Sequence, residues 1–422
     1  METQPARPRI NLHVPLPSLG ISPASMHIAY ISPYQGPQLL ARRPSVVNLS
    51  LACNMKTEVV SELLRRQGHS VEIVSPGQAE RQSRLKFYRG FAEPTSARDG
   101  SPVFYPSCIP ARFVTGWWTA LRTLALFKAR HRARPFDLVV IYNLKLPQLL
   151  CARHARHLGL PIVLEYEDDE FVEVDGSSMN GFRLRGHHQR ARLTLDFIDA
   201  TFAVSPHLLA QVPNAVCKLL LRGVLGDDYL DPALDSEDSK RNWVAFSGTH
   251  SRAKGLKQLI TAWKELNLPG WELHIAGHGE LTSNIQAMAA GVPTIIFRGM
   301  LNRMANARFL AECKIGMNPH DLSQTPGNVF ATKIVEYLAA GTHVISTRMG
   351  HLEPEIEAGI TYIEDNTSET ILKSLREVIT QGIHRRLARA AAVGLYGPVA
   401  VSDKLQSLIQ QAAARRQQVR LN

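Results

Sequence analysis

The sequence predicts an α/β protein in which two doubly wound, Rossmann-like domains face each other across a cleft. Short apolar strands alternate with helices in two successive series, and this pattern is typical of parallel sheets buried on both faces. An acidic, turn-rich linker without hydrophobic periodicity, residues 226–242, separates the two series. The length of 422 residues agrees, because it exceeds what one hydrophobic core usually supports.

The first series, residues 26–225, has the β-loop-α-β order of nucleotide-binding folds. It starts with an apolar strand at 26–32, a loop whose Gly36 is a candidate for substrate binding, and a helix at 45–68. Further strands are expected at 69–75, 137–143, 161–167 and 200–205. The preceding residues 1–25 are rich in Pro and Arg rather than in the apolar residues of a signal core, so we expect a mobile tail.

The second series, residues 243–382, repeats the alternation of strands and helices. Its strands are expected at 243–248, 271–277, 294–299, 315–319 and 343–347, and its helices at 256–266, 304–313 and 328–341. The last segment, residues 383–422, has a helical pattern and is expected to brace the first domain. Ligands of such open sheets bind at the carboxyl ends of the strands, which here would face the cleft.

The composition is that of an ordinary globular protein, with 45% hydrophobic and 20% charged residues and no apolar run of transmembrane length. The five cysteines are scattered and never form a CxxC pair, so they indicate buried thiols rather than disulfides or a zinc site. The net charge of +11 is concentrated in residues 1–222, which hold 27 Lys and Arg against 17 Asp and Glu. We therefore expect a cytoplasmic protein whose first half meets an anionic partner.

Nucleic acid is not expected as that partner, because the sequence has no zinc finger, no aromatic RNP signature and no basic region joined to heptads. An anionic membrane surface or an anionic lipid-linked substrate fits the basic half, and a merely solvated basic surface is the alternative. The segment 112–135 combines aromatic and aliphatic residues with several cations. A helix of this kind can lie in a membrane interface, unless its apolar face packs on the sheet.

A cationic loop in the second half is the first candidate for a binding site. Lys254 follows the strand that ends at Gly248, and Arg252 lies two residues before it. The helix that begins near Ala331 would add free N–H groups, so together these groups form a site for a diphosphate. Glu336, one helical turn later, can accept two hydrogen bonds from vicinal ribose hydroxyls. For each residue alone, an ordinary solvated side chain is the alternative.

Four segments carry a resemblance to a known family: FSGTHSRAKGLKQLITAWKEL, WELHIAGHGEL, IIFRGML and NVFATKIVEYLAAGTHVIST. In this order they resemble the donor half of the family four glycosyltransferases, which have the GT-B fold. The similarity is specific over residues 243–350 and looser over 26–222. It implies a retaining transferase that takes a sugar from a nucleotide-diphosphate donor and requires no metal or other cofactor. The implied acceptor is a hydroxyl of a polysaccharide or of a lipid-linked glycan.

The resemblance also implies roles for individual residues. Lys254 matches the phosphate-binding lysine of the family, and Glu336 matches the glutamate that holds the ribose. Arg298 falls near the segment that contacts the base. The remaining donor contacts are expected from backbone groups or a hydroxyl near the phosphates, at Gly248, Gly277, Phe330, Ala331, Thr332 and Lys333.

Two departures from the family pattern concern the donor side. Thr249 replaces the arginine that usually follows the glycine of the first donor strand, and Arg252 is the candidate that would take its place. Asn328 replaces the first glutamate of the pair spaced eight residues apart. An asparagine can position the donor sugar, but it cannot act as a base.

A third departure concerns the acceptor side, where Tyr142 and Asn143 follow the strand at which many relatives carry a histidine. Asn143 is therefore a candidate catalytic residue on this side. The acidic cluster after the next strand offers Glu167 and Asp168 as candidates for acceptor binding, and a solvated loop is the alternative. A metal site there is less favoured, because no His or Cys has the spacing of a partner ligand.

Two other functions stay open on the sequence alone. A nucleotide-sugar epimerase uses the same two-domain frame, but it needs acidic residues and a histidine close to the sugar, and the sequence shows no clear set of these. A nucleotide-sugar-binding partner without turnover is also compatible with Thr249 and with the missing histidine. Neither the base, the sugar nor the acceptor can be deduced from these motifs, because the fold and the phosphate site do not encode specificity.

Overall fold

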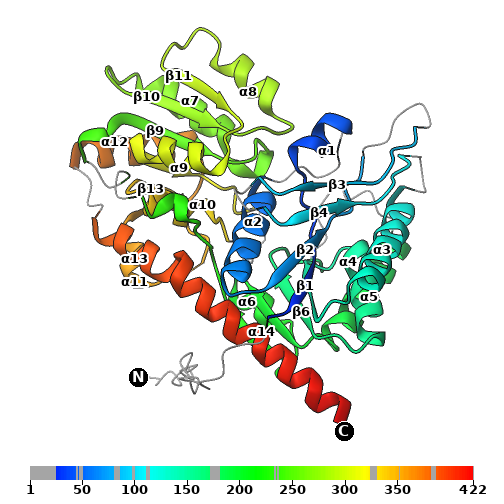
Figure 1. Ribbon diagram of the computed structural model, residues 1–422. Helices are drawn as coiled ribbons and strands as arrows, with labels where there is room; N and C mark the ends of the chain where they lie inside the picture. Colours follow the sequence, from blue (N-terminus) through cyan, green and yellow to red (C-terminus); the bar gives the residue numbers. More distant parts are fainter. Residues whose placement is uncertain are drawn as a thin grey trace, which may run out of the picture.

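The computed structural model describes residues 25–43, 46, 51–79, 86–96, 100–110, 115–171, 181–231, 234, 237–323, 330–350, 352–381 and 386–421. The expected N-terminal tail, apart from residue 25, and the candidate Asn328 lie outside these residues. The described part forms two α/β units with one sheet each (Figure 1), which confirms the predicted fold class.

The first sheet has eight strands in the order β3-β4-β2-β1-β5-β6-β7-β8. All neighbouring strands are parallel except β3 and β4, which form an antiparallel pair at one edge. The strands are β1 (His27–Ile31), β2 (Ser70–Val74), β3 (Phe91–Pro94), β4 (Pro102–Tyr105), β5 (Leu138–Tyr142), β6 (Ile162–Tyr166), β7 (Ala200–Ala203) and β8 (Cys217–Leu220).

Helices cover both faces of this sheet: α1 (Pro37–Arg42), α2 (Leu51–Arg66), α3 (Thr115–Ala133), α4 (Leu146–His157), α5 (Gly181–Leu195) and α6 (Pro206–Ala210). Alternate residues of β1 enter different cores, as the twofold repeat of a strand requires. Ile28 and Tyr30 pack with α2, whereas Ala29 and Ile31 pack with α3 and α4. The sheet is thus buried on both sides, as its continuous apolar strands predict.

The second sheet has six parallel strands in the order β11-β10-β9-β12-β13-β14. They are β9 (Arg241–Ser247), β10 (Glu272–Ala276), β11 (Ile295–Gly299), β12 (Cys313–Asn318), β13 (His343–Thr347) and β14 (Ile360–Ile363). The helices are α7 (Leu256–Leu266), α8 (Thr282–Ala289), α9 (Arg303–Glu312), α10 (Lys333–Ala339), α11 (Pro354–Glu357), α12 (Ser368–Gln381) and α13 (Arg386–Tyr396). α7 and α12 share one core, and α9, α10 and α13 share the other.

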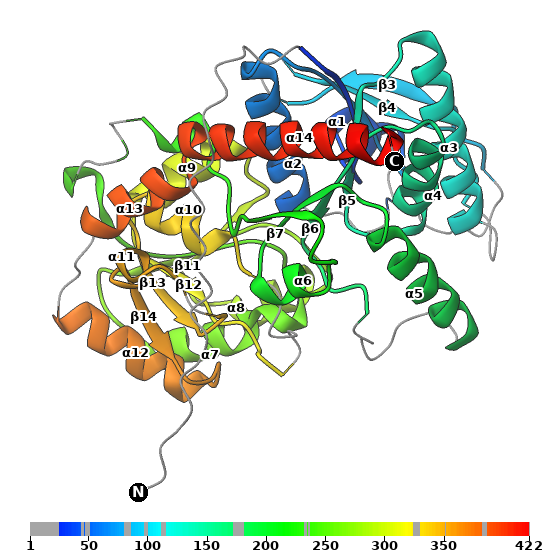
Figure 2. The ribbon, with the colours of Figure 1, turned by 90° about the horizontal axis from the view of Figure 1, so that it is seen from below.

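The C-terminal helix α14 (Pro398–Leu421) returns to the first domain and lies beside α2 (Figures 1 and 2). Arg416 on this helix donates a hydrogen bond from Nη2 to Asp199 Oδ2 over 2.7 Å, and both side chains are buried. His69 and Gln406 form a second link, with 2.8 Å between Nε2 and Oε1. α14 therefore connects the end of the chain to the first sheet.

Some elements differ from those that the sequence predicts. The pair β3–β4 lies in a stretch where the sequence shows no clear periodicity. Both strands have only four residues, β3 ends at Pro94 and β4 begins at Pro102, and β3 is the edge strand of the sheet. α10 begins at Lys333, two residues later than expected. Among the described residues, no helix combines the length and the apolar character needed to cross a membrane.

Candidate active site

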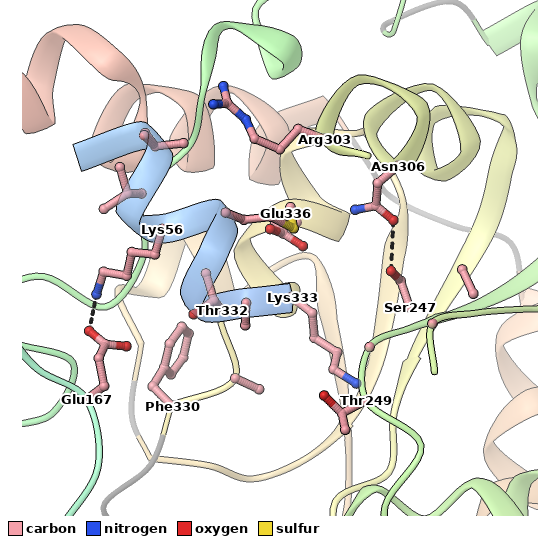
Figure 3. Close-up of a pocket in the computed structure, with 18 of the residues that line it drawn as sticks. Lys56, Glu167, Ser247, Thr249, Arg303, Asn306, Phe330, Thr332, Lys333 and Glu336 are labelled. Atoms are coloured by element: carbon pink, nitrogen blue, oxygen red, sulfur yellow. Dashed lines mark hydrogen bonds and ion pairs between the residues drawn. The ribbon is translucent and has the colours of Figure 1, made fainter. Parts of the chain in front are cut away.

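A cavity with a volume of about 270 Å³ lies between the two domains (Figure 3). The first domain contributes α2 and the residues at and after the carboxyl ends of β5 and β6. The second domain contributes the ends of β9 and β10, the start of α9, and α10 with the residues before it. Eleven candidates from the sequence line the cavity: Glu167, Asp168, Gly248, Thr249, Lys254, Gly277, Phe330, Ala331, Thr332, Lys333 and Glu336.

Two glycines shape the donor side of the cavity. Gly248 follows β9 and Gly277 follows β10, and both have positive φ values, +147° and +123°. A Cβ atom on Gly277 would lie 1.9 Å from the carbonyl oxygen of Gly248, so no side chain fits there. The absence of side chains brings the two strand ends together and leaves the space above them open.

Lys254 lies in a 3-10 turn after β9 and is held by a histidine. Its Nζ is 2.6 Å from Nε2 of His320, while Nδ1 of His320 is 2.7 Å from Oδ1 of Asn318. Because Oδ1 only accepts, Nδ1 carries the ring proton and Nε2 accepts from the ammonium group. Burial lowers the pKa of Lys254, and Asp168 across the cleft acts in the opposite direction.

Lys333, the first residue of α10, extends into the same space. Its Nζ lies 3.9 Å from the centre of the Phe246 ring. Burial lowers the pKa of this ammonium well below its ordinary value, and the charge of Lys254 lowers it further. Figure 3 shows the Lys333 side chain reaching toward Thr249. Glu336, one turn later on α10, lies nearer to Arg303 than the Lys333 ammonium group does.

Glu336 lines the cavity one turn along α10. Burial raises the pKa of its carboxyl group to about 7, and the charges of Lys333 and Arg303 limit this rise. A carboxylate with this surrounding can accept hydrogen bonds from two hydroxyl groups, which would supply part of the solvation that it has lost. The cations and Glu336 thus offer partners for a diphosphate and for a ribose in one cavity.

On the first-domain side, Asn143 is not among the described residues that line the cavity, but it positions two acidic residues that do. Asn143 is buried and has a φ of +57°. Its Nδ2 donates to Asp168 Oδ2 over 2.8 Å, and its Oδ1 accepts from the amides of Glu167 and Asp168 over 2.7 and 3.1 Å. Burial raises the pKa of Asp168, and Glu170 raises it further by repulsion.

Glu167 belongs to a buried ionic cluster with Lys56 from α2. The ammonium group of Lys56 donates to Glu167 and lies 3.5 Å from Oε1 of Glu165. Oε2 of Glu165 accepts a hydrogen bond from the Tyr30 hydroxyl. Burial raises the pKa of Glu167 to about 7, with a further contribution from Glu165. The cluster fixes the first-domain wall of the cavity (Figure 3).

Three other candidates are not among the described residues that line the cavity. Arg252 is exposed on the turn that carries Lys254. Arg298 is exposed, donates to His274 Nδ1 over 2.9 Å and lies over the Trp243 ring. Gly36 faces Glu93, whose carboxylate accepts hydrogen bonds from the amides that start α1. The roles expected for Arg298 and Gly36 therefore stay predictions, at positions outside the lining of this cavity.

The sequence does not predict six polar residues that line the cavity: Lys56, Tyr229, Ser247, Arg303, Asn306 and His320. Ser247 Oγ donates a hydrogen bond to Asn306 Oδ1 over 2.8 Å (Figure 3). Arg303 Nη2 donates to Asp228 Oδ2 over 2.7 Å, and its Nη1 lies 3.4 Å from Glu62 and 3.8 Å from Glu58. These residues come from α2, the linker, the end of β9, α9 and the segment after β12, so tertiary packing rather than one local motif brings them together. In the described part of the chain, no group of three or more His, Cys, Asp or Glu could hold a metal ion.

Two family matches cover most of this architecture. Residues 241–381 match the family described as glycosyl transferases group 1, and residues 54–217 match the glycosyl transferase 4-like domain. The chain therefore belongs to the glycosyl transferases of group 1, which confirms the resemblance seen in the sequence. A GDP-mannose-dependent α-(1-6)-phosphatidylinositol dimannoside mannosyltransferase of Mycobacterium tuberculosis is 30% identical over 147 residues. That segment is 34% of this chain and 37% of the relative.

Solved structures share the fold over nearly the whole chain. Sucrose-phosphate synthase from Thermosynechococcus elongatus has a TM-score of 0.65 at 15% identity, covering 92% of this chain and 99% of that one. HepE of Anabaena, in complex with UDP and glucose, has a TM-score of 0.61 at 14% identity, covering 91% and 99%. A Listeria monocytogenes protein described as a UDP-N-acetylglucosamine 2-epimerase has a TM-score of 0.55 at 14% identity, covering 92% and 96%. At these identities the likeness concerns the fold.

Proposed function

We propose that this protein transfers a sugar from a nucleotide-diphosphate donor to a hydroxyl group of a polysaccharide or of a lipid-linked glycan, with retention at the anomeric carbon. The observation that carries the proposal is that one interdomain cavity combines the cations of Lys254 and Lys333 with the carboxyl group of Glu336. A diphosphate requires positive charge, and a ribose requires hydrogen-bond acceptors. Family membership and the UDP bound to HepE, which has the same fold, support this choice of ligand.

In this reaction the bond between the anomeric carbon and the diphosphate oxygen breaks, and the acceptor oxygen forms its bond on the same face of the sugar. The acceptor proton passes to the departing phosphate oxygen. Negative charge grows on the leaving diphosphate, where the ammonium groups stabilise it by preorganised electrostatics. Because the side chains of Lys254 and Lys333 supply this positive charge, we expect transfer to continue after chelation of divalent metal ions with EDTA.

An assay with a panel of UDP-, GDP- and ADP-sugars tests the proposal. We expect one donor to release its nucleoside diphosphate and to yield a glycosylated acceptor, and NMR of the product would show the anomeric configuration. Release of no nucleotide from any donor would contradict turnover. A product with inverted configuration would contradict retention alone.

An epimerase is the second candidate, because Glu167, Asp168 and His320 line the same cavity as the donor groups. Acidic residues and a histidine near the sugar are what epimerisation requires. The two functions differ in their products, since an epimerase converts one nucleotide sugar into another. Detection of a rearranged nucleotide sugar without an acceptor would favour the epimerase over the transferase.

A lipid-linked acceptor is supported by the relative named for phosphatidylinositol dimannoside and by one surface of the first domain. On α3, Trp117 and Leu121 are 48% and 52% exposed, and on the neighbouring α5 Leu193 is 56% exposed. Arg190 lies 5.5 Å from the Trp117 ring, and Arg192 is exposed. Exposed apolar side chains with arginines are typical of helices that bind anionic membranes at the interface.

The rest of α3 is bound to the protein itself. Phe127 is buried in the core beneath the helix, and Arg130 forms a bidentate pair with Glu72. The proposed attachment is thus peripheral, at the cytoplasmic face of a membrane, and involves the α3–α5 surface only.

We expect flotation with phosphatidylglycerol vesicles at low salt to be lost in a Trp117→Ser, Leu193→Ser variant. Val399→Ser, at an exposed site on α14, is the matched control, and equal binding of all three proteins would contradict the attachment.

A further inference from the structure

The ammonium group of Lys333 is buried in the cavity without an acceptor. Its Nζ has no hydrogen-bond partner among the residues that the structure describes. Its contact with the Phe246 ring, 3.9 Å from Nζ to the ring centre, holds the group in place but does not replace a hydrogen bond. A buried charge without a hydrogen-bonded partner is costly, so the position is suited to an anion that enters the cavity.

The strand end opposite Lys333 leaves room for the ammonium group. A Cβ atom on Gly248 would lie 3.1 Å from Lys333 Nζ, so a side chain at this position would crowd it. The next residue is Thr249, which brings no charge, and Figure 3 shows Lys333 reaching toward it. Lys254 lies close enough to Lys333 for their charges to repel. An anion between them would remove this repulsion.

We propose that the side chain of Lys333 provides the second positive charge for the donor diphosphate, at the place where Thr249 supplies none. Lys254 binds the diphosphate from the turn after β9, and Lys333 binds it from α10. This assignment rests on the proposed function and deepens it, because it names the group that compensates for an uncharged residue at position 249. Arg252, the sequence-based candidate for this role, is exposed and outside the lining of the cavity.

Proton uptake on binding follows from the surroundings of Lys333. Lys254, His250 and His320 face it from the turn after β9 and from the end of β12, and Glu336 lies on its own helix. Burial and Lys254 favour the neutral amine, whereas a bound diphosphate favours the ammonium form. At neutral pH Lys333 should therefore take up a proton when a diphosphate binds, whereas Glu336, if it holds the ribose as a carboxylate, should release one.

Isothermal titration calorimetry of three proteins with UDP, GDP, uridine and guanosine tests the assignment: the wild type, Lys333→Met and Lys257→Met. Lys257 is the matched control, because it is a lysine on the exposed side of α7. We expect Lys333→Met to bind the nucleoside diphosphate about 10- to 100-fold more weakly than the wild type. Its affinity for the nucleoside should equal that of the wild type. Titrations in two buffers of different ionisation enthalpy should show that Lys333→Met takes up fewer protons on binding than the wild type, because only the Lys333 contribution is lost.

Unchanged affinity for the diphosphate in Lys333→Met would overturn the assignment, and so would an equal loss for diphosphate and nucleoside. A loss in Arg252→Met without a loss in Lys333→Met would give the role to Arg252 instead. Lys333→Gln replaces Lys333→Met if that variant does not show the wild-type circular dichroism spectrum. If the wild type binds neither nucleoside diphosphate, the proposed function itself fails, which separates the two results.

Discussion

His320 accepts a hydrogen bond from Lys254 across 2.6 Å, between Nε2 of the ring and Nζ of the lysine. The bond requires a neutral ring, and burial together with the charge of Lys254 lowers the pKa of His320 well below its ordinary value. Asn318 fixes the ring through Nδ1. A neutral acceptor orients the ammonium group without cancelling its charge, so the remaining N–H bonds stay available to a phosphate.

Replacement of His320 by phenylalanine removes this acceptor. We expect the KM for the donor to rise about 2- to 10-fold, the range of one net hydrogen bond, while the KM for the acceptor is unchanged. His320→Gln can still accept a hydrogen bond and should lose less. Initial rates at varied donor concentration measure the effect, and an unaltered donor KM in His320→Phe would show that the bond does not orient Lys254 for binding.

Replacement of Lys254 by alanine should affect turnover more strongly. We expect kcat to fall about 100- to 1000-fold, as when one preorganised donor to a developing negative charge is removed. Lys257→Ala, with its side chain exposed on α7, is the control for a general loss of positive charge. A Lys254→Ala protein with the wild-type kcat would exclude the lysine from the stabilisation of the leaving group.

The ionisation of Glu336 gives donor binding a defined pH dependence. The pKa of about 7 lies above the ordinary value of 4.5, so at pH 6 most of the free protein carries the neutral acid. Since the carboxylate accepts hydrogen bonds better than the acid, the contribution of Glu336 to the affinity for a nucleoside diphosphate should increase between pH 6 and 8, opposite in sign to the contribution of Lys333. Glu336→Gln should bind more weakly and lose that part of the increase. Calorimetry across this pH range measures both effects, and parallel profiles would contradict the role of Glu336.

The same shift predicts the pH dependence of stability without a ligand. Because the folded state binds the proton more tightly than the unfolded state, the contribution of Glu336 is fully present below pH 4.5 and is lost as the pH rises through about 7. We therefore expect the melting temperature of the wild type, compared with Glu336→Gln, to decrease over this interval. Differential scanning calorimetry checks the direction, and a relative increase would contradict the assigned pKa.

Arg303 connects this titration to the interface of the two domains. It lies on α9 and reaches Glu58 and Glu62 on α2 and Asp228 in the linker. Its charge also lowers the pKa of Glu336. In Arg303→Met, we expect the pH midpoint of donor binding to move above that of the wild type, because Glu336 loses a nearby cation. A midpoint at the same pH or below would show that Arg303 does not act on Glu336.

The order of strands and helices explains why much of this site could be predicted from the sequence. Lys254 and Glu336 each follow a strand of one parallel sheet, and the carboxyl ends of such strands meet at one edge. Their meeting in one cavity therefore depends only on local motifs. Arg303 could not be predicted in the same way, because Asn302 identifies the start of α9 but not the face that meets α2.

Lys333 and Asn143 show a second limit of the sequence. Lys333 was expected to contribute its backbone amide, but the direction of its side chain depends on where α10 begins and on the open space at Gly248. Asn143 was expected to contact the substrate, yet its left-handed backbone turns its side chain toward the amides of Glu167 and Asp168. Such directions depend on backbone angles that the residue types alone do not determine.

Asp168 lines the cavity on the first-domain side, and Asn143 Nδ2 donates to its carboxylate over 2.8 Å. If Asp168 binds the acceptor hydroxyl, Asp168→Asn should raise the KM for the acceptor about 10-fold or more and leave the KM for the donor within about twofold of the wild type. Asn143→Ala should shift the acceptor KM in the same direction. It should also lower the free energy of unfolding by about 1 to 3 kcal/mol, because buried hydrogen bonds are lost. Bisubstrate kinetics with urea unfolding measure these effects. A change in the donor KM alone would place Asp168 at the donor and contradict its assignment to the acceptor.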